Sequence, residues 1–184
     1  MLPGSPLILC PYIQQVMNII TKFTLSSQPG LDVLHLLTQA LAREKFAALL
    51  PRRTLDEYIA RCFSKAALIA ETNSMSNQWL VVYADDNPAG YARITSKGKR
   101  PQVLEGKQAV RIADFGILSS YTDLAVSNSL FEKCMAVCQP YEGIWINEYT
   151  ANPLINFFES KGFIRQPDVL PLGELPLASV CLTA

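Results

Sequence analysis

Alternating strand-like and helix-like segments between residues 109 and 163 constrain the fold most. A near-continuous apolar run at 109–118 precedes a helical segment at 124–139, a short apolar run at 143–148, and a second helical segment at 151–161 that Gly162 ends. Strand, helix and strand in this order predict two parallel strands, because the helix returns the chain in the same direction. Ligands of such sheets bind beyond the carboxyl ends of the strands. The turns after Leu118 and Glu148 are therefore the first places to look for a site.

The flanking segments predict further strands and helices. We expect a strand at 19–25, helices at 31–50, 54–63 and 64–73, an antiparallel hairpin of strands at 79–83 and 89–95, and a closing strand pair at 163–166 and 177–182. Thr54 and Glu57 have the spacing of a capping box, and Ser64 is a candidate helix cap. The order predicts an α/β (α+β) protein with a mixed central sheet of six to seven strands flanked by helices.

The length and composition predict one globular domain. The chain has 184 residues, of which 49% are hydrophobic and 17% charged, and its formal net charge is zero. The neutral balance argues against nucleic-acid binding, and no apolar run reaches the roughly 18 residues of a membrane span. We expect residues 17–184 to form the domain. Residues 1–16 are then an N-terminal extension, or translation starts at Met17.

The five cysteines predict buried, reduced thiols and a cytoplasmic protein, because their number is odd and no Cys-x-x-Cys pair occurs. Cys134 and Cys138 lie four residues apart on one helix face, which leaves a two-thiolate metal site open as an alternative. The sole histidine, His35, is distant in sequence. We expect no metal.

Three short motifs carry a family resemblance. They are an aromatic and leucine pattern at 46–50 and 55–59, the sequence Gly-Tyr-Ala-Arg at 90–93, and Phe-Phe-Glu-Ser-Lys-Gly-Phe at 157–163. With the element order, they resemble the GNAT superfamily of N-acetyltransferases from about residue 19 to the end, and most closely the bacterial spermine/spermidine acetyltransferase type. The resemblance implies a GNAT fold in which the fourth and fifth strands splay apart.

The resemblance also implies acetyl-coenzyme A as co-substrate in that splay. Its diphosphate would lie on backbone amides of the loop at 122–127, at the start of a helix. The residues that this places near the donor are Ile117, Leu118, Thr122, Asp123, Leu124, Ala125, Val126, Ser127, Asn152 and Phe158.

The donor motif is degenerate. Thr122 stands where the family has Gln or Arg, and Ala125 and Ser127 stand at two glycine positions. Asp123 is the most adverse change, because a carboxylate about 5 Å from a diphosphate repels it by several tenths to a few kcal/mol. Asp123 is equally suited to cap the helix that follows.

The candidate catalytic residues are Asp114 and Leu118. The resemblance implies that the Leu118 amide polarises the thioester carbonyl and that Asp114 acts as base. The structural alternative for Asp114 is a buried carboxylate held by the backbone or by Arg111. Phe158 replaces a tyrosine that many relatives use to protonate the leaving thiolate, a loss of about 10² to 10⁴ in rate.

Glu148 and Tyr149 are the candidate substrate contacts, for a cationic amine, although Glu148 is also placed to cap the next helix. Two functions stay open. One is acetyl transfer to a small amine such as a polyamine. The other is a catalytically inactive ligand-binding or protein-interaction module with the same fold. A different acyl donor in the same cleft is a third possibility. A small-molecule amine is the expected partner, with a homodimer allowed for and neither nucleic acid nor membrane expected.

Overall fold

The computed structural model describes residues 17–167 and 172–184, so the extension at 1–16 lies outside the described residues. Seven strands form one sheet in the order β1-β2-β3-β4-β5-β7-β6. The strands are β1 (Ile19–Phe23), β2 (Asn77–Ala84), β3 (Asn87–Thr95), β4 (Ala109–Ile117), β5 (Gly143–Tyr149), β6 (Ile164–Gln166) and β7 (Ser179–Thr183). The helices are α1 (Gln28–Phe46), α2 (Arg52–Cys62), α3 (Lys65–Thr72), α4 (Leu124–Cys138) and α5 (Leu154–Ser160), with a 3₁₀ turn, η1 (Gln102–Leu104).

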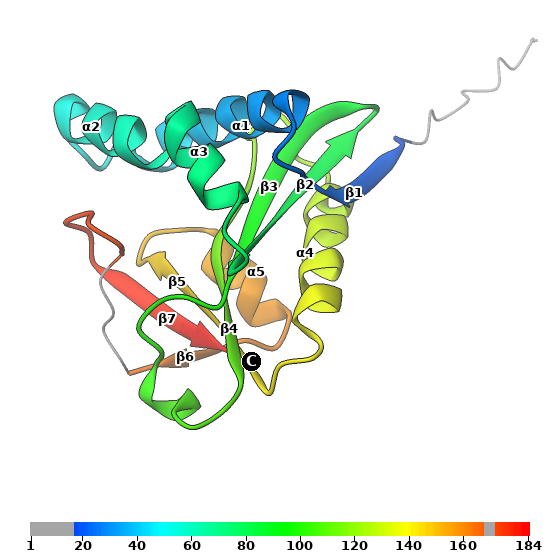
Figure 1. Cartoon of the computed structure of the whole chain (residues 1–184). Coiled ribbons are helices and arrows are strands. Elements are labelled where there is room, and N and C mark those ends of the chain that lie inside the picture. The colour runs from blue at the N-terminus through cyan, green and yellow to red at the C-terminus, as the bar shows by residue number, and fades with distance from the viewer. Residues whose placement is uncertain (1–16, 168–171) are drawn as a thin grey trace, which may run out of the picture.

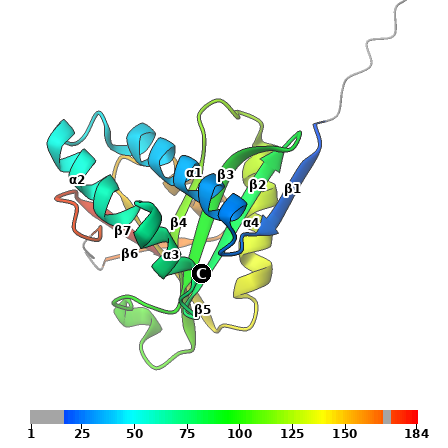
Figure 2. The ribbon, with the colours of Figure 1, turned by 45° about the horizontal axis from the view of Figure 1, so that its top comes forward.

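The helices cover both faces of the sheet (Figures 1 and 2). α1, α2 and α3 lie on one face, and α4 and α5 on the other. The strand β2 is buried on both sides: Trp79 and Val81 pack in the cluster with α1 to α3, and Leu80 and Val82 pack in the cluster with α4 and α5. Among the described helices, none is both long and apolar enough to cross a membrane.

The expected sheet is confirmed, including its antiparallel hairpin. β2 pairs antiparallel with β3 through a two-residue turn, Asp85 and Asp86, whose φ angles are 47° and 63°. Left-handed residues at both turn positions match the twist of the flanking strands. The closing pair is also confirmed: β6 pairs antiparallel with β7, which lies between β5 and β6.

Of the two caps predicted for α2 and α3, that of α3 is confirmed and that of α2 is wrong. The Ser64 hydroxyl accepts a hydrogen bond from the Ala67 amide at the start of α3. Thr54 caps nothing, because α2 begins earlier, at Arg52 after Pro51. Glu57, the expected capping partner, instead accepts a hydrogen bond from Arg53 at 2.8 Å. Pro51 fixes its own φ near a helical value and has no amide proton to satisfy, which suits the start of a helix.

The sheet opens between β4 and β5, as predicted. These parallel strands pair only from Ala109 with Gly143 to Ile112 with Ile146. Beyond that point β4 keeps its pairing with β3 and β5 keeps its pairing with β7. In Figure 1, β5 and β7 accordingly run at a wide angle to β2 and β3.

Candidate functional site

A bulge in β4 aims Asp114 at the opening. The register with β3 shifts between Arg93, opposite Asp114, and Ile94, opposite Ile112, so Ala113 is one extra residue. Ala113 and Asp114 consequently both line a cavity on the side of α1 to α3, whereas Ile112 and Phe115 belong to the core under α4 and α5. Simple alternation along the strand would have turned Asp114 into that core.

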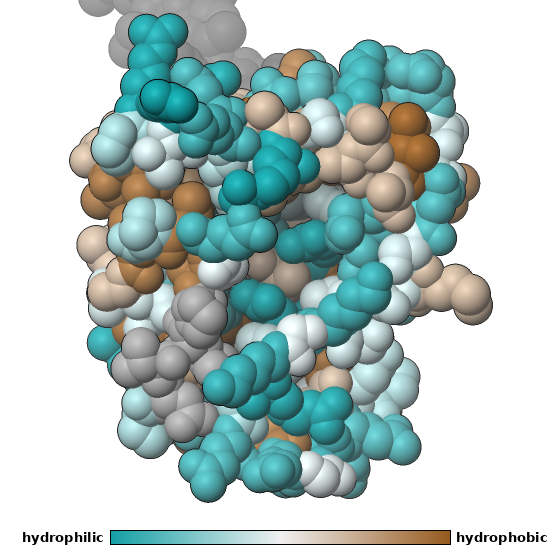
Figure 3. Space-filling view, turned by 60° about the vertical axis from the view of Figure 1, so that its left-hand side comes forward, coloured by the Kyte–Doolittle hydropathy of each residue, from teal (hydrophilic) through white to brown (hydrophobic). Residues whose placement is uncertain are grey.

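The cavity has a volume of about 390 Å³, within the range of small-molecule sites. It lies between the helices α1, α2 and α3 on one side and the strands β3, β4 and β5 on the other, with residues 172–175 at its edge. Figure 3 shows this side of the molecule, where mostly hydrophilic residues surround the hollowed centre. Asp114 and Glu148, predicted from separate strands, both line it.

Lys45, from the last turn of α1, joins these two acids. Its Nζ donates hydrogen bonds to Asp114 Oδ1 at 3.0 Å and to the Phe115 carbonyl at 2.8 Å, and lies 3.9 Å from Glu148 Oε1. The Tyr91 hydroxyl donates to the other Asp114 oxygen. The side chains of Lys45 and Asp114 are only 12% and 20% exposed. A lysine ammonium therefore lies where β4 and β5 part.

Burial and charge act against each other in this group. Burial raises the pKa of Asp114, but the Lys45 ammonium and the Tyr91 hydroxyl outweigh burial, so the pKa lies below its usual value. Burial lowers the pKa of Lys45, and the charges of Asp114 and Glu148 raise it above its usual value. For Glu148, burial dominates and raises the pKa. Glu148 is thus the carboxylate of the pair that takes up a proton more readily.

Glu148 is fixed from the other side by Asn152. Glu148 Oε2 accepts a hydrogen bond from Asn152 Nδ2 at 2.6 Å, and Asn152 Oδ1 accepts one from the Leu154 amide at 3.0 Å. The interpretation of Glu148 as a helix cap is therefore wrong, since its side chain bonds Asn152, and the N-cap of α5 is Pro153, whose side chain makes no capping hydrogen bond. Asn152, predicted to contact the donor, is committed to this network. Tyr149 is half-buried and does not itself line the cavity; its ring lies 5.6 Å from that of Phe46, which does.

The amide predicted to polarise the thioester is already bonded. Leu118 N–H donates to the Ala89 carbonyl at 2.8 Å, which extends the pairing of β4 with β3. The assignment of Leu118 as the oxyanion donor is thus corrected. Amides alternate in direction along a strand, so those of Ile117 and Phe115 point away from β3, toward the opening.

Within the predicted diphosphate loop, a side chain of the protein already occupies a backbone amide. Asp123 caps α4, its Oδ1 accepting from the Ala125 amide at 2.8 Å, which confirms the capping interpretation. Before this loop, Ser119 donates from its amide and hydroxyl to Glu44 on α1. Of the other residues expected there, Val126 is buried in the core and Ser127 is half-buried. Thr122, Leu124 and Ala125 are exposed.

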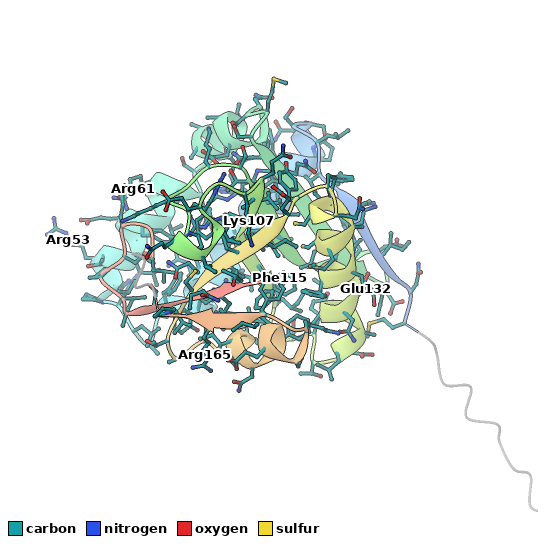
Figure 4. The ribbon with its side chains drawn as sticks, turned by 90° about the horizontal axis from the view of Figure 1, so that it is seen from below. Arg53, Arg61, Lys107, Phe115, Glu132 and Arg165 are labelled. Atoms are coloured by element: carbon teal, nitrogen blue, oxygen red, sulfur yellow. The ribbon has the colours of Figure 1, made fainter. Side chains whose placement is uncertain are left out.

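Phe158 lies in an aromatic core cluster and has no exposed surface. Its ring centroid lies 5.3 Å from that of Phe115 and 5.4 Å from that of Phe163, with Phe131 and Phe157 adjoining. Figure 4 shows Phe115 among closely packed side chains beside α5. Phe158 is a packing residue here and does not line the cavity.

Several cavity residues escaped the sequence prediction, notably Lys45, Tyr91, Arg93 and Arg111. Lys45 carried a signal, because it follows Leu41 by four residues and so shares the buried face of α1. The expected pairing of Asp114 with Arg111 is not found; the Arg111 guanidinium lies over the Trp145 ring at 4.7 Å.

Cys62 lines the cavity, whereas Cys134 and Cys138 lie in the core under α4. Cys134 and Cys138 are buried, and burial raises the pKa of both thiols, that of Cys138 to about 12. Within residues 17–167 and 172–184, no three or more His, Cys, Asp or Glu side chains are grouped to hold a metal ion.

Comparison with known proteins gives no matching family model. The solved structures that are similar in fold include the following three. PaiA N-acetyltransferase from Thermoplasma acidophilum, in complex with coenzyme A, is 12% identical with a TM-score of 0.72, over 90% of this chain and 98% of that chain. A GCN5-related N-acetyltransferase from Rhodopseudomonas palustris is 13% identical with a TM-score of 0.65, over 91% and 96%. The ribosomal-protein-S18-alanine N-acetyltransferase from Escherichia coli is 10% identical with a TM-score of 0.59, over 89% and 92%. The chain therefore has the fold of the GNAT N-acetyltransferases.

Proposed function

We propose that the chain is an N-acyltransferase that transfers an acetyl group from acetyl-coenzyme A to a small amine. One observation carries the proposal: the parallel strands separate after Ile112 and Ile146, and a cavity with two buried carboxylates adjoins the separation. The similar fold of a protein in complex with coenzyme A supports it. The opening would receive the thioester end of the donor, and the cavity would receive the amine.

The protein suits the thioester end of acetyl-coenzyme A better than its diphosphate end. At the thioester end, the outward direction of the Ile117 and Phe115 amides suits a carbonyl oxygen, so we assign the oxyanion contact to Ile117 in place of Leu118. At the diphosphate end, Asp123 occupies the Ala125 amide and adds negative charge. Bound acetyl-coenzyme A would supply the activated acetyl group, held mainly by its thioester half.

Glu148 is the better candidate for the base. A general base works best when its pKa lies near the working pH, and burial moves the pKa of Glu148 upward. Asp114 is less suited, because Lys45 and Tyr91 already donate to its two oxygens. We therefore assign proton removal from the amine to Glu148, and to Asp114 the placement of Lys45.

Acetyl-coenzyme A titration tests the donor. A ligand at a hundredfold its dissociation constant stabilises a fold by about 2.7 kcal/mol, so we expect a thermal shift and release of coenzyme A in the presence of amines. No shift at millimolar acetyl-coenzyme A would end the proposal.

Replacing the base tests the chemistry. Glu148→Gln should lower turnover by about 10² to 10⁴ and leave acetyl-coenzyme A affinity unchanged, as measured by thiol release and calorimetry. Glu132→Gln, an exposed change on α4, is the control. Equal turnover in the two variants would remove Glu148 from the mechanism.

A second candidate is a ligand-binding module without catalysis. The Lys45 ammonium in the opening favours it, because this cation lies beside the carboxylates that a substrate ammonium would otherwise meet. Phe158, which has no proton to donate, favours it too. Acetyl-coenzyme A binding without coenzyme A release for any amine would select this function.

A further inference from the structure

Charge inside the cavity is balanced by pairs, with one exception. Four cations and four carboxylates line the cavity: Lys45, Arg61, Arg93, Arg111, Glu71, Asp114, Glu148 and Glu174. Arg93 pairs with Glu71 at 2.8 Å, and Arg61 pairs with Glu174 at 2.5 Å. Lys45 serves both remaining acids.

Arg111 is the exception. Among the described residues, no ion pair within 4.0 Å joins its guanidinium to a carboxylate. Its Nε is buried and has no hydrogen-bond partner, and the Nε of Arg93, on the neighbouring strand, is in the same state. The central carbon of the Arg111 guanidinium lies 4.7 Å from the centre of the Trp145 ring, a cation–π contact.

Burying an arginine N–H without an acceptor lowers the stability of the fold unless a bound ligand supplies the acceptor. A buried guanidinium N–H that lacks an acceptor, such as that at the Arg111 Nε, has lost its hydration without gaining a hydrogen bond in return. Two arginines on paired strands also repel each other. Arginine presents its donors in a planar fork that matches a carboxylate, and such contacts are among the strongest hydrogen bonds in proteins.

We propose that Arg111, assisted by Arg93, binds a carboxylate in this cavity, so that the acceptor is a small amine that also carries a carboxylate, the chemical class of the amino acids. The carboxylate half of this inference stands on the cavity alone, and the amine half rests on the proposed acetyl transfer. The amine would lie toward Glu148 and the carboxylate toward Arg111. A zwitterion would thus meet a carboxylate of the protein at its ammonium end and a guanidinium at its carboxylate end. A polyamine has no group for Arg111.

Calorimetry without acetyl-coenzyme A tests the carboxylate site. The probes are three amino acids, each matched with the amine left after loss of its carboxylate: phenylalanine with phenethylamine, leucine with isopentylamine, and lysine with cadaverine. We expect the amino acid to bind at least about tenfold more tightly in one or more pairs, as for a charge-assisted contact. Equal affinities within every pair, or no binding of any amino acid at millimolar concentration, would overturn the site.

Two variants assign the effect to Arg111. Arg111→Gln should weaken amino-acid binding about 10-fold to 100-fold and leave amine binding unchanged. Arg111→Lys, which keeps the charge and loses the fork, should retain part of the affinity and guards against misfolding of the first variant. Arg43→Gln is the matched control, because Arg43 pairs with Asp56 on the outer face of α1. Unchanged affinity in both Arg111 variants would overturn the assignment.

Coenzyme A release with the same probes separates the two proposals. Amino-acid binding that depends on Arg111, without release, would end the acetyl-transfer function and leave the carboxylate site intact. Release that is equally fast with amines and amino acids would support acetyl transfer and overturn the carboxylate site.

Discussion

Lys45 meets negative charge from both strands that border the opening in the sheet. It bonds Asp114 and the Phe115 carbonyl on β4 and lies 3.9 Å from Glu148 on β5. Its raised pKa keeps the ammonium charged through the neutral and mildly alkaline range. Without it, two carboxylates would share one buried space, which neither tolerates in the ionised form.

Lys45→Met should therefore destabilise the protein by about 3–5 kcal/mol at pH 7, because it leaves the carboxylates of Asp114 and Glu148 without their compensating cation. Lys65→Met is the control: it removes a solvent-exposed ion pair with Asp32 at 2.8 Å, which water screens, so this change should cost far less stability. Urea unfolding at pH 7 measures both. Similar costs for the two variants would contradict the buried-bridge account.

The penalty of Lys45→Met should shrink as the pH falls toward 5. In the wild type the pKa of Asp114 is lowered, so its contribution to stability is present above its unfolded value and is lost as the pH falls through the folded one. In the variant the two acids lose their cation, their pKa values rise, and protonation relieves them. A penalty that grew with acidity would refute this linkage.

At the scale of elements, short irregular segments and helix ends set the direction of the Asp114 side chain and the backbone amides near the opening. The bulge in β4 turns Asp114 toward the helices, and the pairing of β4 with β3 points the Leu118 amide away from the opening. The start of α4 carries its own anion, Asp123, whereas the start of α3 is capped by Ser64, a neutral side chain.

Asp123→Gly should tighten acetyl-coenzyme A binding, because it removes a carboxylate near the expected diphosphate position and frees the Ala125 amide. A change to glycine at a helix cap costs only a few tenths of a kcal/mol. Ser64→Gly makes the same change in a cap of α3 and should leave the affinity unaltered. Calorimetry that found equal affinity in both variants would refute the role given to the α4 cap.

Gly90→Ala should destabilise the protein by at least about 1–3 kcal/mol, because an added Cβ would clash with the backbone oxygen of Gly116 and force β3 away from β4. Gly116→Ala should cost less, since its Cβ would meet only side-chain ends, at 3.1 Å or farther, on Leu41 and Lys45. Thermal unfolding compares the two. The reverse order of stability would contradict the close pairing of β3 with β4.

At the scale of the molecule, the sheet separates two kinds of interior. The side of α4 and α5 is a dry core that holds the aromatic cluster of Phe115, Phe131, Phe157, Phe158 and Phe163. The side of α1 to α3 contains the charged cavity in addition to its apolar cluster. The opening between β4 and β5 lies at the border between these two interiors.

Phe158→Tyr tests whether residue 158 is a packing residue of the core or a group that contacts the acetyl donor. A hydroxyl buried without a partner costs about 1–3 kcal/mol, so we expect loss of stability and no gain in turnover. Phe157→Tyr, on the same helix and half-buried, should cost less. Unfolding and thiol-release assays report the two effects. A gain in turnover would place position 158 at the donor, with the new hydroxyl as an acid.

The sequence by itself determined the order of the elements, the hairpin, and the caps at Ser64 and Asp123, because periodicity and capping act over a few residues. Thr54 shows the limit, since the neighbouring Pro51 starts α2 before the capping box can act. Tertiary structure alone decided the partner of Asp114, which lies 69 residues away on α1. It also decided the direction of the Leu118 amide and the absence of an ion pair between Arg111 and a described carboxylate. These depend on which strand pairs with which and on one extra residue in β4, and no local interaction encodes them.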